Sequence, residues 1–252
     1  RQDFLIPNLM ESNKINLVYS HYDRYIAGGV VPQDSHLKLE TIDPLKSDYF
    51  FERRELGIIN IGQPGEVEVD GTTYTVGHKE ALYVGKGSKE VVFSGEGARY
   101  YLNSATAHHA YPTKLITQAD AEIVELGALK TSNARTIRKL IVNSVVETCQ
   151  LQMGMTELKE GSVWNTMPAH IHDRRMEIYL YFEIPENQAV CHFMGQKEET
   201  RGIWLGNEQA VISPPWSMHC GSGTSNYTFI WGMCGENLDY GDMDGFAPSE
   251  MR

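Results

Sequence analysis

The amino-acid sequence predicts an all-β protein built from two similar halves. Apolar residues recur with a period of two in short runs, which is the alternation of half-buried strands. Gly, Pro and Asn separate these runs at spacings of about ten residues, as in sandwiches and barrels. The chain has 252 residues, of which 41% are apolar. That length is enough for either one large domain or two smaller ones.

The predicted strands fall into two groups along the chain. In the first half they are expected at 56–61, 66–69, 81–84, 90–93 and 99–102. In the second half they are expected at 148–158, 176–182, 189–194, 210–213 and 227–233. The alternation lapses between the groups, where residues 117–126 predict a short helix. We therefore expect an N-terminal barrel over 1–112, a linker over 113–136 and a C-terminal barrel over 137–252.

A weak internal repeat supports two copies of one β unit. Residues 52–56 (ERREL) resemble residues 173–177 (DRRME), and residues 76–84 (VGHKEALYV) resemble residues 205–213 (LGNEQAVIS). The shifts between the paired segments differ by only a loop's length. Two barrels in tandem are therefore more economical than one decorated barrel.

Composition excludes several classes of protein. The chain carries 22 Lys and Arg against 33 Asp and Glu, a formal charge of −11, which argues against nucleic acid as a partner. No apolar run approaches the length of about 18 residues that a membrane span needs. The four cysteines form no C-x-x-C pair, so we expect reduced thiols and a cytoplasmic protein. An anionic ligand would need a local cation.

The second half contains a group of residues suited to metal binding. His170 and His172 are two apart and share one face of a strand, so both can address one point. Residues 173–175 are polar enough for a turn, after which Glu177 begins the next strand. With His219, the set offers three imidazoles and one carboxylate, which suit a divalent first-row metal. The alternative is a surface histidine pair with His219 in a loop, but the combination favours one metal ion per chain.

These residues resemble the two motifs of the cupin superfamily. The first motif corresponds to Gly161…His170-x-His172-x4-Glu177, and the second to Gly206…Pro214-x-Trp216-x2-His219. The chain departs from the usual pattern in a longer gap after Gly161, in Trp216 where Gly is typical, and in Gly223 where Asn is typical. The ligands themselves are intact. The resemblance implies jelly-roll β-barrels and hence a bicupin.

A more specific resemblance is to the 5-keto-4-deoxyuronate isomerase family, and it runs from about Val18 to the C-terminus. It rests on the strings FERRELG (51–57), LYVGKG (82–87), WNTMP (164–168), RRME (174–177) and FIWGM (229–233). The resemblance implies a zinc-bound hexamer that converts 5-keto-4-deoxyuronate to 3-deoxy-D-glycero-2,5-hexodiulosonate. This aldose–ketose isomerisation belongs to the breakdown of unsaturated uronates from pectin or glycosaminoglycans.

The first half lacks the ligand set. Tyr49, Phe51 and Glu90 stand at the positions that correspond to the three histidines. We therefore expect no metal in the N-terminal barrel and a role for it in structure and oligomerisation.

The sequence does not identify the group that moves the proton from C2 to C1. Tyr181, His109 and a metal-bound hydroxide are the alternatives, and a hydride shift between the two carbons fits the same residues. Tyr179 and Tyr181 share the strand face of Glu177, so each either lines the pocket or fills the core.

An acidic protein needs a cation to hold an acidic sugar. Arg174 and Arg175 lie in the turn beside Glu177, and arginine can bind both oxygens of a carboxylate. The alternative is that both arginines are solvated or pair with Asp173 and Glu183.

Two other functions are compatible with these residues. A metal-dependent dioxygenase uses the same ligand set, and a sugar-binding bicupin without catalysis would conserve the fold. Oxygen uptake would identify the first, and the absence of product would identify the second.

Overall fold

The computed structural model describes residues 2–236 and 238–252, and it confirms the prediction that the chain is mostly β. The chain divides into two compact units. The N-terminal unit comprises Leu9–Glu122 and Leu140–Met153. The C-terminal unit comprises Ile123–Lys139 and Gly154–Arg252, together with the segment that ends at Asn8.

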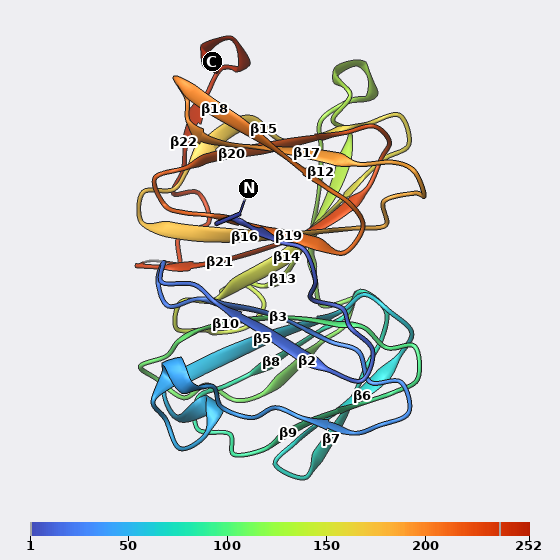
Figure 1. Ribbon diagram of the computed structural model, residues 1–252, viewed down its shortest axis with the longest axis vertical. Coiled ribbons are helices and arrows are strands. Elements are labelled where there is room, and N and C mark those ends of the chain that lie inside the picture. The colour runs from blue at the N-terminus through green and yellow to red at the C-terminus, as the bar shows by residue number, and fades with distance from the viewer. Residues whose placement is uncertain (1, 237) are drawn as a thin grey trace. The chain divides into compact units, whose positions relative to one another are not determined.

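The N-terminal unit consists of a six-stranded and a four-stranded antiparallel sheet. The larger sheet has the order β11-β8-β5-β10-β3-β2, and the smaller has the order β4-β9-β6-β7 (Figure 1). The strands are β2 (Ile15–Tyr19), β3 (Ile26–Val30), β4 (Leu37–Lys38), β5 (Arg54–Asn60), β6 (Gly65–Val69), β7 (Thr72–Val76), β8 (Ala81–Val84), β9 (Val91–Ser94), β10 (Tyr100–Thr106) and β11 (Lys114–Ile116). Two short 3₁₀ turns, η1 (Asp43–Leu45) and η2 (Phe50–Glu52), precede β5.

An apolar cluster fills the interior of the N-terminal unit. Its members come from both sheets and from η2 and include Phe51, Leu82, Phe93 and Tyr100, each nearly or fully buried. Alternation produces this core, as in β6, whose residues are buried and exposed in turn. The Phe93 and Tyr100 rings pack 5.3 Å apart between centroids. The inside of this unit is therefore packed with apolar side chains.

A buried carboxylate ties residues 149–151 into the N-terminal unit. Glu55 on β5 accepts the backbone N–H groups of Cys149, Gln150 and Leu151 at 2.8–2.9 Å. It also accepts the hydroxyl of Tyr83 at 2.7 Å. Four donors compensate the cost of burying a carboxylate, so this segment belongs with the N-terminal sheets.

The C-terminal unit holds most of a seven-stranded sheet and a five-stranded sheet (Figure 1). The pairs β16–β19 and β16–β21 of the first and β15–β20 and β17–β20 of the second are antiparallel. The orders of the two sheets are β1-β19-β16-β21-β14-β13-β12 and β18-β17-β20-β15-β22. The strands are β1 (Leu5–Ile6), β12 (Glu122–Leu126), β13 (Arg135–Ile141), β14 (Gln152–Leu158), β15 (Trp164–Ile171), β16 (Arg175–Phe182), β17 (Val190–Gln196), β18 (Glu199–Leu205), β19 (Gln209–Ser213), β20 (Met218–Gly223), β21 (Thr228–Gly235) and β22 (Asp244–Phe246). The 3₁₀ turns η3 (Leu129–Thr131) and η4 (Pro248–Glu250) complete it.

The division differs from the predicted boundaries at 112 and 136. Strand β1 pairs with β19, so the first residues belong to the C-terminal unit. The chain then passes between the units after Glu122, after Lys139 and after Met153. A cut based on composition could not find these points, because two of them fall inside strands β13 and β14.

The helix predicted for residues 117–126 is wrong. Residues Glu122–Leu126 form strand β12 at the edge of the seven-stranded sheet, next to β13. Neighbouring Ile123 and Val124 favour a strand once a partner strand supplies hydrogen bonds. The predicted linker thus contains strands β11 and β12 and the first residues of β13. Among the described residues, no helix is long and apolar enough to cross a bilayer.

Candidate metal centre and its pocket

The structure brings the four predicted ligands to one point in the C-terminal unit. We call His170, His172, Glu177 and His219 the metal cluster. Each offers one ligand atom, and these atoms all lie within 4.8 Å of one another. His170 on β15 pairs directly with His219 on β20, while His172 follows the end of β15 and Glu177 belongs to β16. Both sheets of the unit therefore contribute ligands.

The ligand atoms of the metal cluster face one another closely. His219 Nε2 lies 2.8 Å from Glu177 Oε2, and His172 Nε2 lies 3.4 Å from Glu177 Oε1. The Nε2 atoms of His170 and His172 are 2.9 Å apart. Glu177 Oε2 and His219 Nε2 are buried, and their contact lacks hydrogen-bond geometry. Two buried polar atoms without a hydrogen-bond partner, close to two further imidazole nitrogens, fit a shared cation.

The outer nitrogens of two histidines contact backbone carbonyls. His172 Nδ1 lies 2.9 Å from the carbonyl oxygen of Asp242 and 3.0 Å from Nη2 of Arg175. His219 Nδ1 lies 3.4 Å from the carbonyl oxygen of Ser217. A proton on Nδ1 leaves Nε2 with its lone pair directed at the cluster, which is the tautomer that a metal ligand needs.

Charge in the metal cluster also favours ligation. Burial pushes the pKa of Glu177 upward, but the imidazoles of His219 and His172 outweigh it and hold that pKa well below its usual value. Burial, with the neighbouring His219, lowers the pKa of His170 to about 3. The carboxylate is therefore ionised and His170 is neutral near pH 7, as metal ligation requires.

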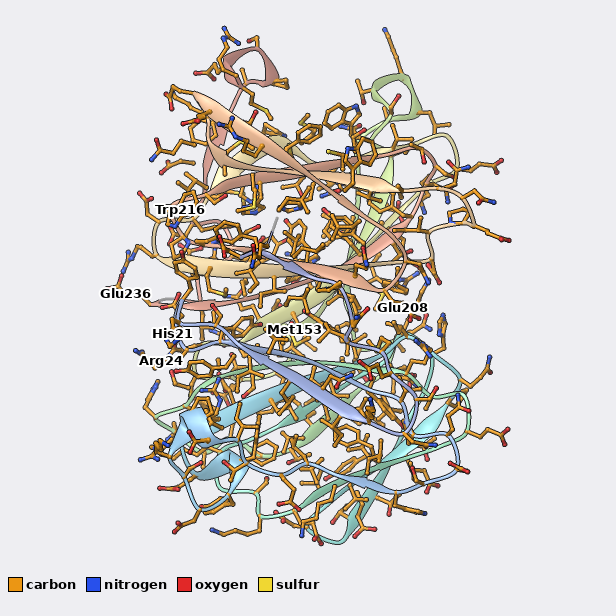
Figure 2. The ribbon with its side chains drawn as sticks, viewed as in Figure 1. His21, Arg24, Met153, Glu208, Trp216 and Glu236 are labelled. Atoms are coloured by element: carbon orange, nitrogen blue, oxygen red, sulfur yellow. The ribbon has the colours of Figure 1, made fainter. Side chains whose placement is uncertain are left out.

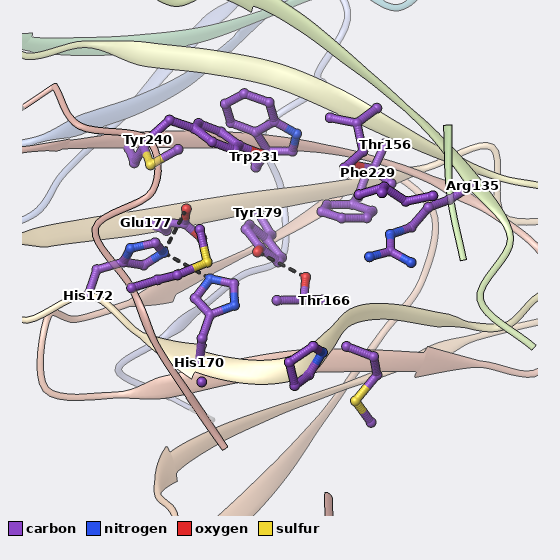
Figure 3. A pocket seen from close by; sticks show the side chains of 17 residues that line it. Arg135, Thr156, Thr166, His170, His172, Glu177, Tyr179, Phe229, Trp231 and Tyr240 are labelled. Carbon is purple, nitrogen blue, oxygen red and sulfur yellow. Dashed lines mark hydrogen bonds and ion pairs between the residues drawn. The ribbon is translucent and has the colours of Figure 1, made fainter. Parts of the chain in front are cut away.

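The metal cluster opens into a cavity of about 320 Å³ within the C-terminal unit (Figure 3). This volume lies at the lower end of the range for small-molecule sites. Besides His170, His172 and Glu177, the wall consists of Leu126, Arg135, Ile137, Thr156, Thr166, Met167, Pro168, Tyr179, Phe229, Trp231, Met233, Tyr240, Met243 and Gly245. The wall is largely apolar and carries few polar groups, which is typical of a ligand pocket.

A backbone irregularity in β15 presents a hydroxyl to this pocket. The register of β15 against β20 shifts between Asn165 and His170. Within that bulge Thr166 has a φ of 55°, an unfavourable conformation for a β-branched residue. Its Oγ1 lies 3.1 Å from the hydroxyl of Tyr179. Strain of this kind concentrates at functional sites, where the surrounding structure sustains it.

The two arginines proposed from the sequence do not line the pocket. Arg174 is exposed and pairs with Glu236 at 2.9 Å; Glu236 is labelled at the edge of the molecule in Figure 2. Arg175 is buried and donates to the carbonyl of Asp242 at 3.1 Å, the same carbonyl that His172 contacts. Arg174 lies in the turn before β16 and Arg175 is the first residue of that strand, so the two neighbouring side chains have different surroundings. Arg175 therefore lies outside the pocket and helps to position the candidate metal ligand His172.

The residues considered for acid–base catalysis differ in whether they line the pocket. Tyr179 lines the pocket, whereas the hydroxyl of Tyr181 bonds to His192 Nδ1 at 2.8 Å and Tyr181 is absent from the wall. Burial raises the pKa of both phenols well above the usual value. His109 is an exposed residue of the N-terminal unit, and its ring packs 4.6 Å from that of Tyr111.

Several wall residues could not be found from the sequence. Arg135 and Thr156 lie on neighbouring strands β13 and β14, and Trp231 lies on β21 beside them. Arg135 fell in the predicted linker, where no strand was expected. The alternation of Arg135 with Ile137 was the one signal that both side chains share a face.

The two-sheet units and the buried His and Glu set define a cupin-like β-protein with a candidate metal centre. The model of the KduI/IolB family matches residues 4–244. The chain belongs to this family, which confirms the resemblance seen in the sequence.

Curated relatives cover nearly the whole chain. A protein from Formosa agariphila is 65% identical, covering 100% of this chain and 91% of its own length. Relatives from Bacteroides fragilis and Lachnoclostridium phytofermentans are 56% and 54% identical, covering 97% and 100% of this chain and 89% and 93% of their own. All three are called 4-deoxy-L-threo-5-hexosulose-uronate ketol-isomerase. The chain is accordingly an enzyme of the aldose–ketose isomerase class, an intramolecular oxidoreductase.

Solved structures share the fold at much lower identity. An IolB-like protein from Salmonella typhimurium aligns with a TM-score of 0.78 at 13% identity, covering 96% of each chain. The oxalate decarboxylase of Lactobacillus farciminis aligns with a TM-score of 0.60 at 9% identity, covering 96% of this chain and 89% of its own. These likenesses concern the fold alone.

Proposed function

We propose that this enzyme is a metal-dependent ketol-isomerase that converts 5-keto-4-deoxyuronate to 3-deoxy-D-glycero-2,5-hexodiulosonate. The observation that carries the proposal is the metal cluster at the wall of a cavity of monosaccharide size. The relatives' shared name supports the substrate, because identity of 54% or more extends over almost the entire chain. No sequence feature favours the dioxygenase or the non-catalytic binder over this reaction.

In this proposal some pocket residues hold a cation, and others orient the substrate. A divalent cation held by the metal cluster would supply Lewis-acid chemistry to the C1 carbonyl and the C2 hydroxyl. Tyr179 lies on the wall beside the cluster, and its raised pKa keeps it protonated near pH 7. We assign Tyr179 the hydrogen bond to a reacting oxygen of the sugar, with Thr166 fixing the direction of its hydroxyl.

The apolar wall gives the pocket a second role. Phe229, Trp231 and Met233 border the cavity and limit the water inside it. Exclusion of water strengthens the electrostatic interactions of a bound sugar.

The proposal includes the biological setting. We propose zinc as the metal, one ion per chain, since three imidazoles and a carboxylate suit it. We further propose a bicupin that assembles as a homohexamer in the cytoplasm, acting on uronates released from pectin or glycosaminoglycans, with neither nucleic acid nor a membrane as partner. The four cysteines are all free, which agrees with a reducing compartment.

An anaerobic assay tests the proposed function. The metal-loaded protein is incubated with 5-keto-4-deoxyuronate and the product is identified by NMR. Appearance of the 2,5-hexodiulosonate without oxygen supports the isomerase. A reaction that occurs only with oxygen uptake would instead identify a dioxygenase, and binding without turnover would identify a sugar-binding protein.

A further inference from the structure

Arg135 is the cation of the pocket wall. It begins strand β13 and is partly buried, and the residues that line the cavity include no other Arg or Lys. Within the described part of the chain its guanidinium makes one hydrogen bond, a local one from Nη1 to the carbonyl of Asn133 at 2.9 Å. Most of its five N–H donors therefore remain available to a ligand.

No carboxylate neutralises Arg135 within the described residues. Other arginines of this unit have acidic partners, such as Arg138 with Glu157 at 2.6 Å and Arg174 with Glu236 at 2.9 Å. Burial lowers the pKa of Arg135, and the phenols of Tyr240 and Tyr179 act against it. A guanidinium stays charged in this environment. A half-buried charge without a counter-ion is costly, and a bound anion would remove that cost.

Arg135 and the metal cluster face the cavity from opposite sides. Figure 3 shows Arg135 near Phe229 and Thr156, His172 and Glu177 at the far side, and Tyr179 between the two. The cavity thus has a site for carbonyl and hydroxyl oxygens at one end and an anion site at the other. The two ends of a linear hexuronate match these two ends of the cavity, because its reacting carbons are C1 and C2 and its carboxylate is at C6.

We propose that Arg135 binds the C6 carboxylate of the substrate and thereby sets its direction in the pocket, with C1 and C2 at the metal cluster. This inference rests on the proposed function for the identity of the sugar. The planar fork of the guanidinium matches the two carboxylate oxygens. Because the whole protein carries a charge of −11, this local cation also explains how the pocket admits an anion.

Steady-state kinetics of the metal-loaded protein test the assignment. Arg135→Gln should raise KM for 5-keto-4-deoxyuronate by about 10- to 100-fold, the value of a charge-assisted hydrogen bond, with a smaller change in kcat. Arg135→Lys keeps the charge and loses the fork, so it should recover part of the loss. Arg174→Gln is the matched control and should leave both constants unchanged. An Arg135→Gln enzyme with the wild-type KM would overturn the proposal.

A binding experiment separates this inference from the proposed function. Isothermal titration compares D-galacturonate with D-galacturonamide, which lacks the negative charge. The wild type should bind the acid more tightly than the amide by about tenfold or more, and Arg135→Gln should bind the two alike. Equal affinities in the wild type would refute the carboxylate site. The expected preference in a protein inactive on the ketouronate would refute the proposed substrate but support Arg135. Unchanged metal content and melting temperature show that the variant is folded.

Discussion

The two units use the same kind of fold and differ in what lies inside it. Each is built on two antiparallel sheets. In the N-terminal unit the interior is an apolar cluster to which Phe51 belongs. In the C-terminal unit His172, at the position equivalent to Phe51 in the repeat, is buried in the metal cluster. Both units bury many apolar residues, and among the described residues the C-terminal unit also buries a converging set of histidines and a carboxylate.

The comparison teaches what a functional interior costs. A packed apolar interior returns about 25 cal/mol per Å² of buried surface, whereas buried polar groups stabilise only when partners satisfy them. In the metal cluster Glu177 Oε2 and His219 Nε2 lack hydrogen bonds of their own. We expect the metal to supply that missing interaction. Substitutions in the metal cluster should therefore mainly lower activity, and substitutions in the N-terminal apolar cluster should mainly lower stability.

The largest effect is expected at the carboxylate ligand. Glu177→Gln removes the anionic ligand, so isomerase activity should fall by about a thousandfold or more, since Lewis-acid catalysis supplies several kcal/mol. Activity on 5-keto-4-deoxyuronate is measured after metal analysis of the same sample. Glu236→Gln, at the surface, is the control. Full activity in Glu177→Gln would place the chemistry outside the metal cluster.

The second effect belongs to the N-terminal unit. Phe51→Ala should lower the free energy of unfolding by about 3–5 kcal/mol, because it opens a cavity in the apolar cluster. Its metal content per folded chain should not change. Urea denaturation measures the stability, with the exposed Leu129→Ala as a control expected within about 0.5 kcal/mol of wild type. Loss of metal in folded Phe51→Ala protein would contradict the division of labour between the units.

A third substitution sharpens the role of the pocket hydroxyl. Tyr179→Phe removes the hydroxyl beside the metal cluster and should lower kcat about a hundredfold while the metal is retained. Tyr181→Phe changes a neighbour on the same strand whose hydroxyl bonds to His192, and it should keep kcat near wild type. Stopped assays at saturating substrate give both values. Equal losses in the two variants would mean that the hydroxyl acts through stability alone.

The smallest effect concerns pH. Burial lowers the pKa of His192 to about 3, so the unfolded chain binds a proton at this site below about pH 6.5 and the folded chain does not. The contribution of His192 to the free energy of unfolding is therefore complete above about pH 6.5. It declines as the pH falls toward 3, by at most about 1.4 kcal/mol per pH unit. His192→Gln should therefore lose less stability than wild type between pH 7 and pH 5. Parallel losses in urea denaturation would show that His192 titrates normally.

The sequence predicted the features that depend on local pattern. Strands such as β6 and β9 were found because alternation of apolar and polar residues reports half-burial directly. The metal cluster was found because its residue types and spacing are restricted by coordination chemistry. Strand β12 was mistaken for a helix, since its hydrogen-bonding partner β13 could not be seen.

The pocket wall was beyond sequence reasoning for a different reason. Arg135 and Tyr179 face one cavity only because β13, β14, β21 and β16 follow one another in the sheet. Arg174 and Arg175 are near Glu177 in sequence, yet neither lines the cavity. Proximity along the chain was therefore a poor guide to which arginine lines the cavity.

Metal stoichiometry tests the central claim most directly. Elemental analysis of the purified protein should give one divalent ion per chain, bound in the C-terminal unit, and His170→Ala/His172→Ala should reduce it to background. Occupancy should return when the wild-type protein, stripped by a chelator, is reloaded, and isomerase activity should return in proportion. Two ions per chain, or full retention in the double variant, would contradict the assignment of the metal to His170, His172, Glu177 and His219.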